Sequence, residues 1–168
     1  MFSALLNGVD LRAVVSAVPK KICLTRDYPF FDDQQAENFI KSTGIVSRRV
    51  AKDSTCASDL CFEAAVSLLH KLDWSKDSIK LLIHISQSPD RQVPATAILL
   101  QNRLGLPSDV AAFDVNLGCS SYPYGYFLIS SLLQSQPLGT RAILTIGDLS
   151  SRLCDPSDSS TTPLFSDV

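Results

Sequence analysis

The sequence has no run of apolar residues long enough to form a membrane-spanning helix. Its N-terminus also lacks the basic segment and long apolar run that are typical of a secretory signal. The chain has 15 basic and 17 acidic residues, for a formal net charge of −2, so there is no electrostatic case for binding nucleic acid or an anionic membrane. We therefore predict a cytoplasmic protein that binds neither.

The cysteines and histidines form no recognisable metal site or disulfide framework. The cysteines number five and include no Cys-x-x-Cys pair: Cys23, Cys56, Cys61, Cys119 and Cys154. This argues against both a disulfide scaffold and a zinc site, and it favours a reducing compartment. His70 falls late in a predicted helix, where a cation interacts well with the C-terminal carbonyls. His84 interrupts an apolar strand, and we interpret it as a core or interface histidine rather than as a catalyst.

The composition is that of an ordinary globular protein of about one domain. The chain has 168 residues, of which 45% are hydrophobic and 19% are charged. We expect strands at 9–18, 45–50, 79–86, 111–115 and 141–147, and helices at 34–42, 58–72, 95–104 and from 119 to about 134. Several strands are apolar throughout, which is typical of strands covered on both faces. The sequence predicts an α/β fold with a central, mostly parallel mixed sheet flanked by helices.

The helix expected after residue 58 has the clearest pattern in the sequence. Ser58 or Asp59 can cap its N-terminus. One face of this helix is apolar and consists of Leu60, Ala64, Leu68 and Leu72. Cys61, Ala65 and Leu69 lie beside that face. The preceding helix is expected to begin after the carboxylates of Asp32 and Asp33 and to end at Gly44.

Cys119 follows the apolar strand at 111–115 and a short Asn-Leu-Gly turn, at the point where the next helix should begin. A helix N-terminus offers unpaired N–H groups and a partial positive charge, which favour a thiolate. In sheets of this kind, reactive groups collect at the carboxyl ends of the strands. We therefore predict that Cys119 is a nucleophile, although a structural cysteine is the alternative.

Short motifs recur along the chain in an order that is specific to one family. They are Thr43-Gly-Ile45 with Arg49, Ala57-Ser-Asp59 with Glu63-Ala-Ala65, Ser86-Gln-Ser-Pro-Asp90, Pro94-Ala-Thr96, Phe113-Asp-Val-Asn116, Cys119-Ser120, Tyr124-Gly125, Ser151-Arg152, Cys154-Asp-Pro156 and Phe165-Ser-Asp167. Each motif is weak alone, but the ordered set covers nearly the whole chain. The chain resembles β-ketoacyl-acyl-carrier-protein synthase III, a condensing enzyme with the thiolase-like fold.

The resemblance implies an acyltransferase of fatty-acid or related acyl-chain biosynthesis. Cys119 would take an acyl group from a coenzyme A or acyl-carrier-protein thioester, and its backbone N–H would serve the oxyanion hole. Malonyl-acyl-carrier-protein would then lose carbon dioxide and attack that acyl group to give a β-ketoacyl product. The resemblance also implies a homodimer, in which residues near Val93 reach the neighbour's acyl pocket, and no metal or tightly bound cofactor.

Two departures from the family pattern affect this interpretation. The family carries a His and an Asn for decarboxylation in a second half of similar fold, and neither His70 nor His84 corresponds to that histidine. Residues 1–168 are therefore interpreted as an N-terminal thiolase-like half without the C-terminal half, and the isolated chain is expected to be inactive. The family's coenzyme A contacts, a Trp and two Arg, are replaced by Asn38, Ser42 and Ser159, so no residue is assigned to coenzyme A.

A second hypothesis is a non-catalytic subunit or assembly module of a heteromeric condensing enzyme. Some condensing enzymes of this superfamily are heterodimers in which one partner is catalytically degenerate. The retained Cys119 favours the enzyme, whereas the missing second half and the changed coenzyme A positions favour the module.

Overall fold

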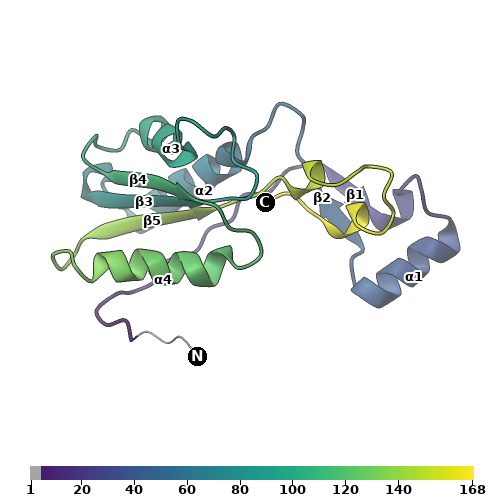
Figure 1. Cartoon of the computed structure of the whole chain (residues 1–168), viewed down its shortest axis with the longest axis horizontal. Coiled ribbons are helices and arrows are strands. Elements are labelled where there is room, and N and C mark those ends of the chain that lie inside the picture. Colours follow the sequence, from purple (N-terminus) through teal and green to yellow (C-terminus); the bar gives the residue numbers. More distant parts are fainter. Residues whose placement is uncertain (1–4) are drawn as a thin grey trace.

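The computed structural model describes residues 5–168, which form a larger part built on a sheet and a smaller part beside it (Figure 1). The larger part contains β3 (Ile79–Ile85), β4 (Ala111–Val115), β5 (Arg141–Ile146), α2 (Ala57–Leu72), α3 (Thr96–Leu104) and α4 (Ser121–Leu133). The smaller part contains β1 (Ile22–Leu24), α1 (Asp33–Thr43) and β2 (Ser47–Arg49). The predicted alternation of strands and helices is thus confirmed in the larger part.

The sheet of the larger part has three parallel strands in the order β4-β3-β5. In the central strand, Ile83 pairs with Phe113 of β4 and with Leu144 of β5. Strand β3 is buried at every position except Lys80, as its near-continuous apolar sequence predicts for a strand with neighbours on both edges and helices on both faces. The prediction of a parallel sheet flanked by helices is confirmed.

The helices cover both faces of this sheet (Figure 1). Helices α2 and α3 pack on one face through a core that consists of Cys61, Ala65, Leu69, Ile79, Leu82, Ala97, Leu100, Leu104, Leu106, Val110 and Ile143. Helix α4 packs on the other face, where Ile129 contacts the opposite side chains of β3, Leu81, Ile83 and Ile85. Residues 116–120 connect β4 to α4, so this packing anchors both ends of that turn.

Helix α2 begins earlier than the sequence predicts. Its N-cap is Cys56, and Asp59 is the third helical residue, whose Oδ2 accepts a hydrogen bond from the Cys56 N–H at 2.8 Å. The prediction that Ser58 or Asp59 is the cap was therefore wrong, because Asp59 satisfies the free N–H from inside the helix. The most buried face of α2 also differs from the predicted apolar face that contains Leu60. The buried residues of this helix are Ala57, Ser58, Cys61, Ala65 and Leu69.

The strand predicted at 9–18 is absent from the structure. Residues 9–18 have no regular secondary structure, and none of their backbone groups has a backbone hydrogen-bond partner within residues 5–168. Side chains nevertheless alternate, with Ala13, Val15 and Ala17 half-buried and Val14 and Val18 exposed. The period-2 pattern is present, but a strand also needs a neighbouring strand to pair with, and residues 5–168 offer none to this segment.

The smaller part is held together by a hairpin and a capped helix. Strand β1, which the sequence analysis missed, pairs antiparallel with β2, and Cys23 lies opposite Arg48. Helix α1 starts as predicted, since Asp32 Oδ1 accepts from the Gln35 N–H at 2.7 Å, and it ends at Gly44 in the left-handed conformation. The Tyr28 hydroxyl donates to the carbonyl of Pro156 at 2.8 Å, which ties this part to the C-terminal loops.

Gly125 allows α4 to approach the sheet closely. A Cβ atom at this position would lie 2.6 Å from Ile85 Cδ1 and 3.1 Å from both methyl carbons of Leu144. We expect Gly125→Ala to displace α4 and to destabilise the fold by about 1–3 kcal/mol, partly offset by the better helix propensity of alanine. Urea unfolding would measure this, with Ser131→Ala as the control in the same helix. Equal stability of the two variants would contradict the close contact.

His84 is fully buried in β3, in line with its interpretation as a core residue. Its Nδ1 lies 3.1 Å from the Thr145 hydroxyl, while its Nε2 has no hydrogen-bond partner within the described residues. Burial lowers the pKa of His84 below 6.5, against the opposing effect of the Asp114, Asp90 and Asp148 carboxylates. The ring is thus only half satisfied, and burial favours its neutral form.

The lowered pKa of His84 predicts a loss of stability in weak acid. Below pH 6.5 the unfolded chain binds a proton at His84 that the folded chain does not bind, until the pH reaches the lower pKa of the folded state. Within that window, this residue alone should lower the free energy of unfolding by up to about 1.4 kcal/mol for each unit by which the pH falls. Urea unfolding at several pH values gives the free energy of unfolding as a function of pH. Its slope should be shallower for His84→Leu than for the unmutated chain. A slope equal to that of the unmutated chain would contradict the prediction.

Candidate active site

Cys119 lies where the sequence predicts, in the turn between β4 and α4. Strand β4 ends at Val115, and the first residue of α4 is Ser121, two positions after the cysteine. The Cys119 side chain is exposed, and neither its sulfur nor its backbone N–H has a hydrogen-bond partner within the described residues. The thiol is therefore accessible at the N-terminal end of a helix, where the backbone dipoles favour negative charge.

The turn before α4 is held by hydrogen bonds that leave Cys119 free. The Ser121 N–H donates to the Gly118 carbonyl at 2.9 Å, and the Ser121 hydroxyl also donates to the Leu117 carbonyl at 2.9 Å. The Tyr124 N–H donates to the Ser120 carbonyl at 3.2 Å. Ser120 and Ser121 thus serve the turn and the start of the helix.

Gln87 is a neighbour of this turn. The sequence analysis names it only as part of the motif Ser86-Gln-Ser-Pro-Asp90. Its side chain rests on Gly118, where an added Cβ would lie 2.6 Å from Gln87 Oε1. Gln87 is the second residue after the end of β3, so it lies at the same edge of the sheet as Cys119. A polar residue close behind a buried strand was the signal that could have pointed to it.

Asp148 organises this edge of the sheet from the end of β5. Its Oδ1 accepts hydrogen bonds from the Ser86 hydroxyl and the Gln87 N–H, each at 2.8 Å, and from both the N–H and the hydroxyl of Ser88, each at 3.0 Å. One carboxylate oxygen therefore fixes the loop that carries Gln87. The sequence analysis missed this role of Asp148.

Asp114 links the strand before Cys119 to the neighbouring helix. Its carboxylate accepts from the backbone N–H groups of Thr96, at 2.6 Å, and of Ala97, at 2.7 Å, at the N-terminus of α3. The negative charge meets the positive end of the helix dipole. These two contacts satisfy the Asp114 carboxylate, and we assign Asp114 a structural role.

The two cysteines of the α2 region have environments that disfavour a thiolate. Burial raises the pKa of the Cys61 thiol to about 12, with smaller contributions from Asp90 and Asp148. Burial also raises the pKa of the Cys56 thiol, and the charges of Asp90 and Asp59 raise it further. A raised thiol pKa lowers the share of thiolate, which is the nucleophilic form, so neither environment favours a nucleophile.

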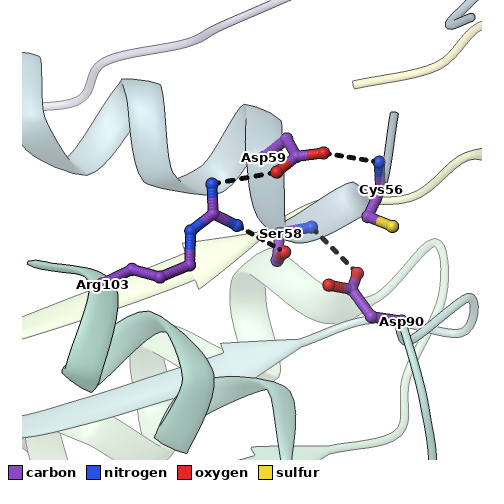
Figure 2. A network of polar contacts seen from close by, with 5 residues as sticks. All are labelled: Cys56, Ser58, Asp59, Asp90 and Arg103. Atoms are coloured by element: carbon purple, nitrogen blue, oxygen red, sulfur yellow. Dashed lines mark hydrogen bonds and ion pairs between the residues drawn. The ribbon is translucent and has the colours of Figure 1, made fainter. Parts of the chain in front are cut away.

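A polar network holds the start of α2 against α3 and the loop after β3 (Figure 2). Arg103 of α3 contacts Asp59 at 2.9 Å and the Ser58 hydroxyl at 3.0 Å, and its guanidinium lies over the Phe62 ring. The Ser58 N–H donates to Asp90 Oδ1 at 3.1 Å. These residues satisfy one another, and we assign them a structural role.

The three positions that the sequence analysis compared with the family's coenzyme A contacts are all exposed, and Asn38 and Ser42 lie one turn apart on α1. Asn38 accepts from the Gln34 side-chain amide at 3.1 Å, and the Ser42 hydroxyl donates to the Phe39 carbonyl at 3.0 Å, both within α1. Ser159 lies in a C-terminal turn, and no interaction within residues 5–168 joins it to either residue. Val93 is also exposed, at 83%.

No cluster of three or more His, Cys, Asp or Glu side chains within residues 5–168 could hold a metal ion. Over the same range, no helix is long and apolar enough to cross a membrane.

Comparison with known proteins yields one consistent match. Residues 113–168, which include Cys119, match the family described as 3-oxoacyl-[acyl-carrier-protein] synthase III. Over 156 residues the chain is 36% identical to a putative 3-oxoacyl-[acyl-carrier-protein] synthase 3 of Campylobacter jejuni, covering 91% of this chain and 44% of the relative. Over 164 residues it is 34% identical to β-ketoacyl-[acyl-carrier-protein] synthase III of Rhodopirellula baltica, covering 97% and 46%.

Solved structures give the same result for the fold. The crystal structure of a 3-oxoacyl-(acyl-carrier protein) synthase from Burkholderia xenovorans aligns with a TM-score of 0.92 and 40% identity, covering 96% of this chain and 46% of that one. The parallel sheet, the helices on both its faces and these alignments define a thiolase-like fold. Within that class, the chain is a relative of the 3-oxoacyl-acyl-carrier-protein synthase III enzymes, as the sequence motifs predicted. It spans about half the length of the relatives that it matches.

Proposed function

We propose that this chain supplies the nucleophile of an acyl-thioester condensing enzyme, and that Cys119 is that nucleophile. The observation that carries the proposal is the exposed thiol at the start of α4, with no hydrogen bond that would occupy it within the described residues. The relatives support it, because their names describe 3-oxoacyl-acyl-carrier-protein synthases.

The first step would be transfer of an acyl group to Cys119. The thiolate attacks the thioester carbonyl, a new C–S bond forms to Sγ, and the bond to the carrier's sulfur breaks; the carrier thiolate then takes up a proton. The free N–H of Cys119 can donate to the oxyanion that develops on the carbonyl oxygen. The Gln87 side chain packs beside Gly118, in the turn that carries Cys119.

The second step, condensation with a malonyl carrier, would need groups from elsewhere. Neither histidine serves here, because His84 is buried in the sheet and His70 lies in the last turn of α2. We propose that the chain corresponds to the N-terminal half of its relatives, and that a second half brings the histidine and asparagine for decarboxylation. The isolated chain is then expected to make no β-ketoacyl product.

The relatives also support a substrate and partner class. Acyl carrier protein is part of their names, so acyl-carrier-protein or coenzyme A thioesters are the proposed substrates, with no tightly bound cofactor. The changes at Asn38, Ser42 and Ser159 leave the choice of carrier open in this proposal. The complete enzyme is proposed to be a cytoplasmic homodimer.

Acylation of a reconstituted protein tests the proposed function. The chain would be combined with a second half taken from the Burkholderia relative and incubated with acetyl thioesters of coenzyme A and of acyl carrier protein. Intact-mass spectrometry should show one added acetyl group, and peptide mapping should place it on Cys119. No adduct with either carrier, or an adduct on another cysteine, would overturn the proposal.

The alternative, a non-catalytic assembly module, makes a different prediction for the same sample. A module should form a defined complex with its partner but should not be acylated. Size-exclusion chromatography combined with the mass measurement separates the two functions. A stable complex without any adduct would favour the module.

A further inference from the structure

The Gln87 carboxamide is an unpaired polar group beside the candidate nucleophile. It lies on Gly118, where an added Cβ would be 2.6 Å from Oε1, 3.0 Å from Cδ and 3.4 Å from Nε2. Gly118 directly precedes Cys119. Within residues 5–168 the Gln87 N–H donates to Asp148, but the carboxamide itself makes no hydrogen bond. One acceptor and two donors are therefore available next to the thiol.

The fold uses the polar groups on either side of Gln87 but not its carboxamide. The Ser86 hydroxyl donates to Asp148 Oδ1 at 2.8 Å, and the Ser88 hydroxyl donates to the same oxygen at 3.0 Å. The Ser88 hydroxyl also accepts from the Leu149 N–H at 2.9 Å. These bonds fix the backbone of the loop, so the carboxamide is presented from an anchored position while it has no structural partner of its own.

An acyl group on Cys119 would change the surroundings of this carboxamide. Gln87 is exposed in this chain, so water can satisfy it. An acyl group bound beside it, with the proposed second half covering the site, would displace that water. A purely apolar acyl chain would then leave the donors and the acceptor unpaired, which is unfavourable. A substrate hydroxyl can both donate to Oε1 and accept from Nε2, and a site that bonds a hydroxyl rejects analogues that lack it.

The contact with Gly118 limits where on the acyl chain that hydroxyl can lie. Gly118 and Cys119 are adjacent, so their Cα atoms are about 3.8 Å apart. The carboxamide is therefore within reach of the first few atoms of an acyl group on Sγ. The acyl carbonyl oxygen is already assigned to the Cys119 N–H, so the hydroxyl belongs further along the chain. Because the carboxamide is centred one residue from the cysteine, the third carbon suits this separation better than the second.

We propose that Gln87 hydrogen-bonds a hydroxyl on the third carbon of a short acyl group and so makes the site select 3-hydroxyacyl thioesters over apolar ones. The covalent step is the acyl transfer already described: the bond to Sγ forms, and the carrier thiolate leaves and takes up a proton. The hydroxyl and the carboxamide keep all their covalent bonds. This inference rests on the proposed function, because it concerns the acyl group that Cys119 accepts.

Competition between two matched thioesters tests this selectivity. The 3-hydroxybutyryl and 3-methylbutyryl groups differ only in a hydroxyl that replaces a methyl group, so they are similar in size. An equimolar mixture on the same carrier would be offered to the reconstituted protein, and peptide mapping would give the ratio of the two adducts on Cys119. The hydroxyacyl adduct should form at least about tenfold faster. Gln87→Leu should abolish this preference, because leucine is of similar size but forms no hydrogen bond.

Gln136→Leu is the matched control, because Gln136 is exposed beyond the other end of α4 and should leave the ratio unchanged. Gln87→Ala is a second variant, which removes the carboxamide without placing methyl groups against Gly118 and should also lose the preference. Equal rates, faster 3-methylbutyryl transfer or an unchanged ratio in both Gln87 variants would overturn this inference and leave the proposed function standing. No adduct from any thioester, acetyl included, would overturn the proposed function and this inference with it.

Discussion

Cys119→Ala should abolish acylation of the reconstituted protein. The expected result is complete loss of the adduct, because the proposed acyl group would be bonded to Sγ and Cys119 is the only exposed cysteine within residues 5–168. Intact-mass spectrometry after incubation with the acetyl thioesters would measure it. An adduct that persists in the variant would exclude Cys119 as the nucleophile.

The other cysteines provide matched controls for this result. Cys154 is partly buried and its sulfur contacts the Ser150 carbonyl at 3.6 Å, so Cys154→Ala should leave the adduct unchanged. Cys61 is 4% exposed, with its pKa raised to about 12, and Cys61→Ala should also be acylated normally. Loss of the adduct in these controls as well would point to a folding defect rather than to a role in catalysis.

Asp167→Ala should cause the largest loss of stability. Asp167 is fully buried, and its carboxylate accepts from the Ala51 N–H at 2.7 Å, from the Ser151 N–H at 2.9 Å and from the Ser151 hydroxyl at 2.8 Å. Alanine would leave these donors buried without an acceptor, at a total cost of about 3–5 kcal/mol. Against a typical stability of about 5–15 kcal/mol, this would unfold a large share of the molecules in mild denaturant.

Urea unfolding followed by circular dichroism would check the Asp167 prediction. Asp53→Ala is the control, because the Asp53 side chain is exposed and makes no hydrogen bond within the described residues. Asp167→Asn should recover only part of the loss, since one oxygen becomes an NH₂ group facing a donor. A midpoint for Asp167→Ala equal to that of the control would show that the contacts do not stabilise the fold.

Several elements could be predicted from local sequence because their signals are local. Strand β4 has the predicted bounds, and α1 begins and ends at the predicted cap residues, Asp32 and Gly44. Strand β1 was missed because it has only three residues and is recognisable only through its pairing with β2. The N-cap of α2 was misplaced because both Ser58 and Asp59 are common cap residues, whereas Asp59 acts here from within the first turn.

For the candidate site, the sequence located Cys119 but not its surroundings. The turn before α4 was recognisable because a strand, a glycine and a cysteine follow one another along the chain. Gln87 and Asp148 come from two other strands, and they meet near the turn only because β3, β4 and β5 are parallel and end at the same edge. Their contribution depends on residues that are far apart in the sequence.

The sequence by itself determined the fold class, the order of the main elements, the position of Cys119 and the family resemblance, because hydrophobic period, cap residues and motif order are properties of neighbouring residues. Only the tertiary structure decided which predicted strands are paired. The segment at 9–18 has the pattern of a strand but no pairing partner within the described residues. Pairing is a property of two segments at once, so a pattern in one segment cannot determine it.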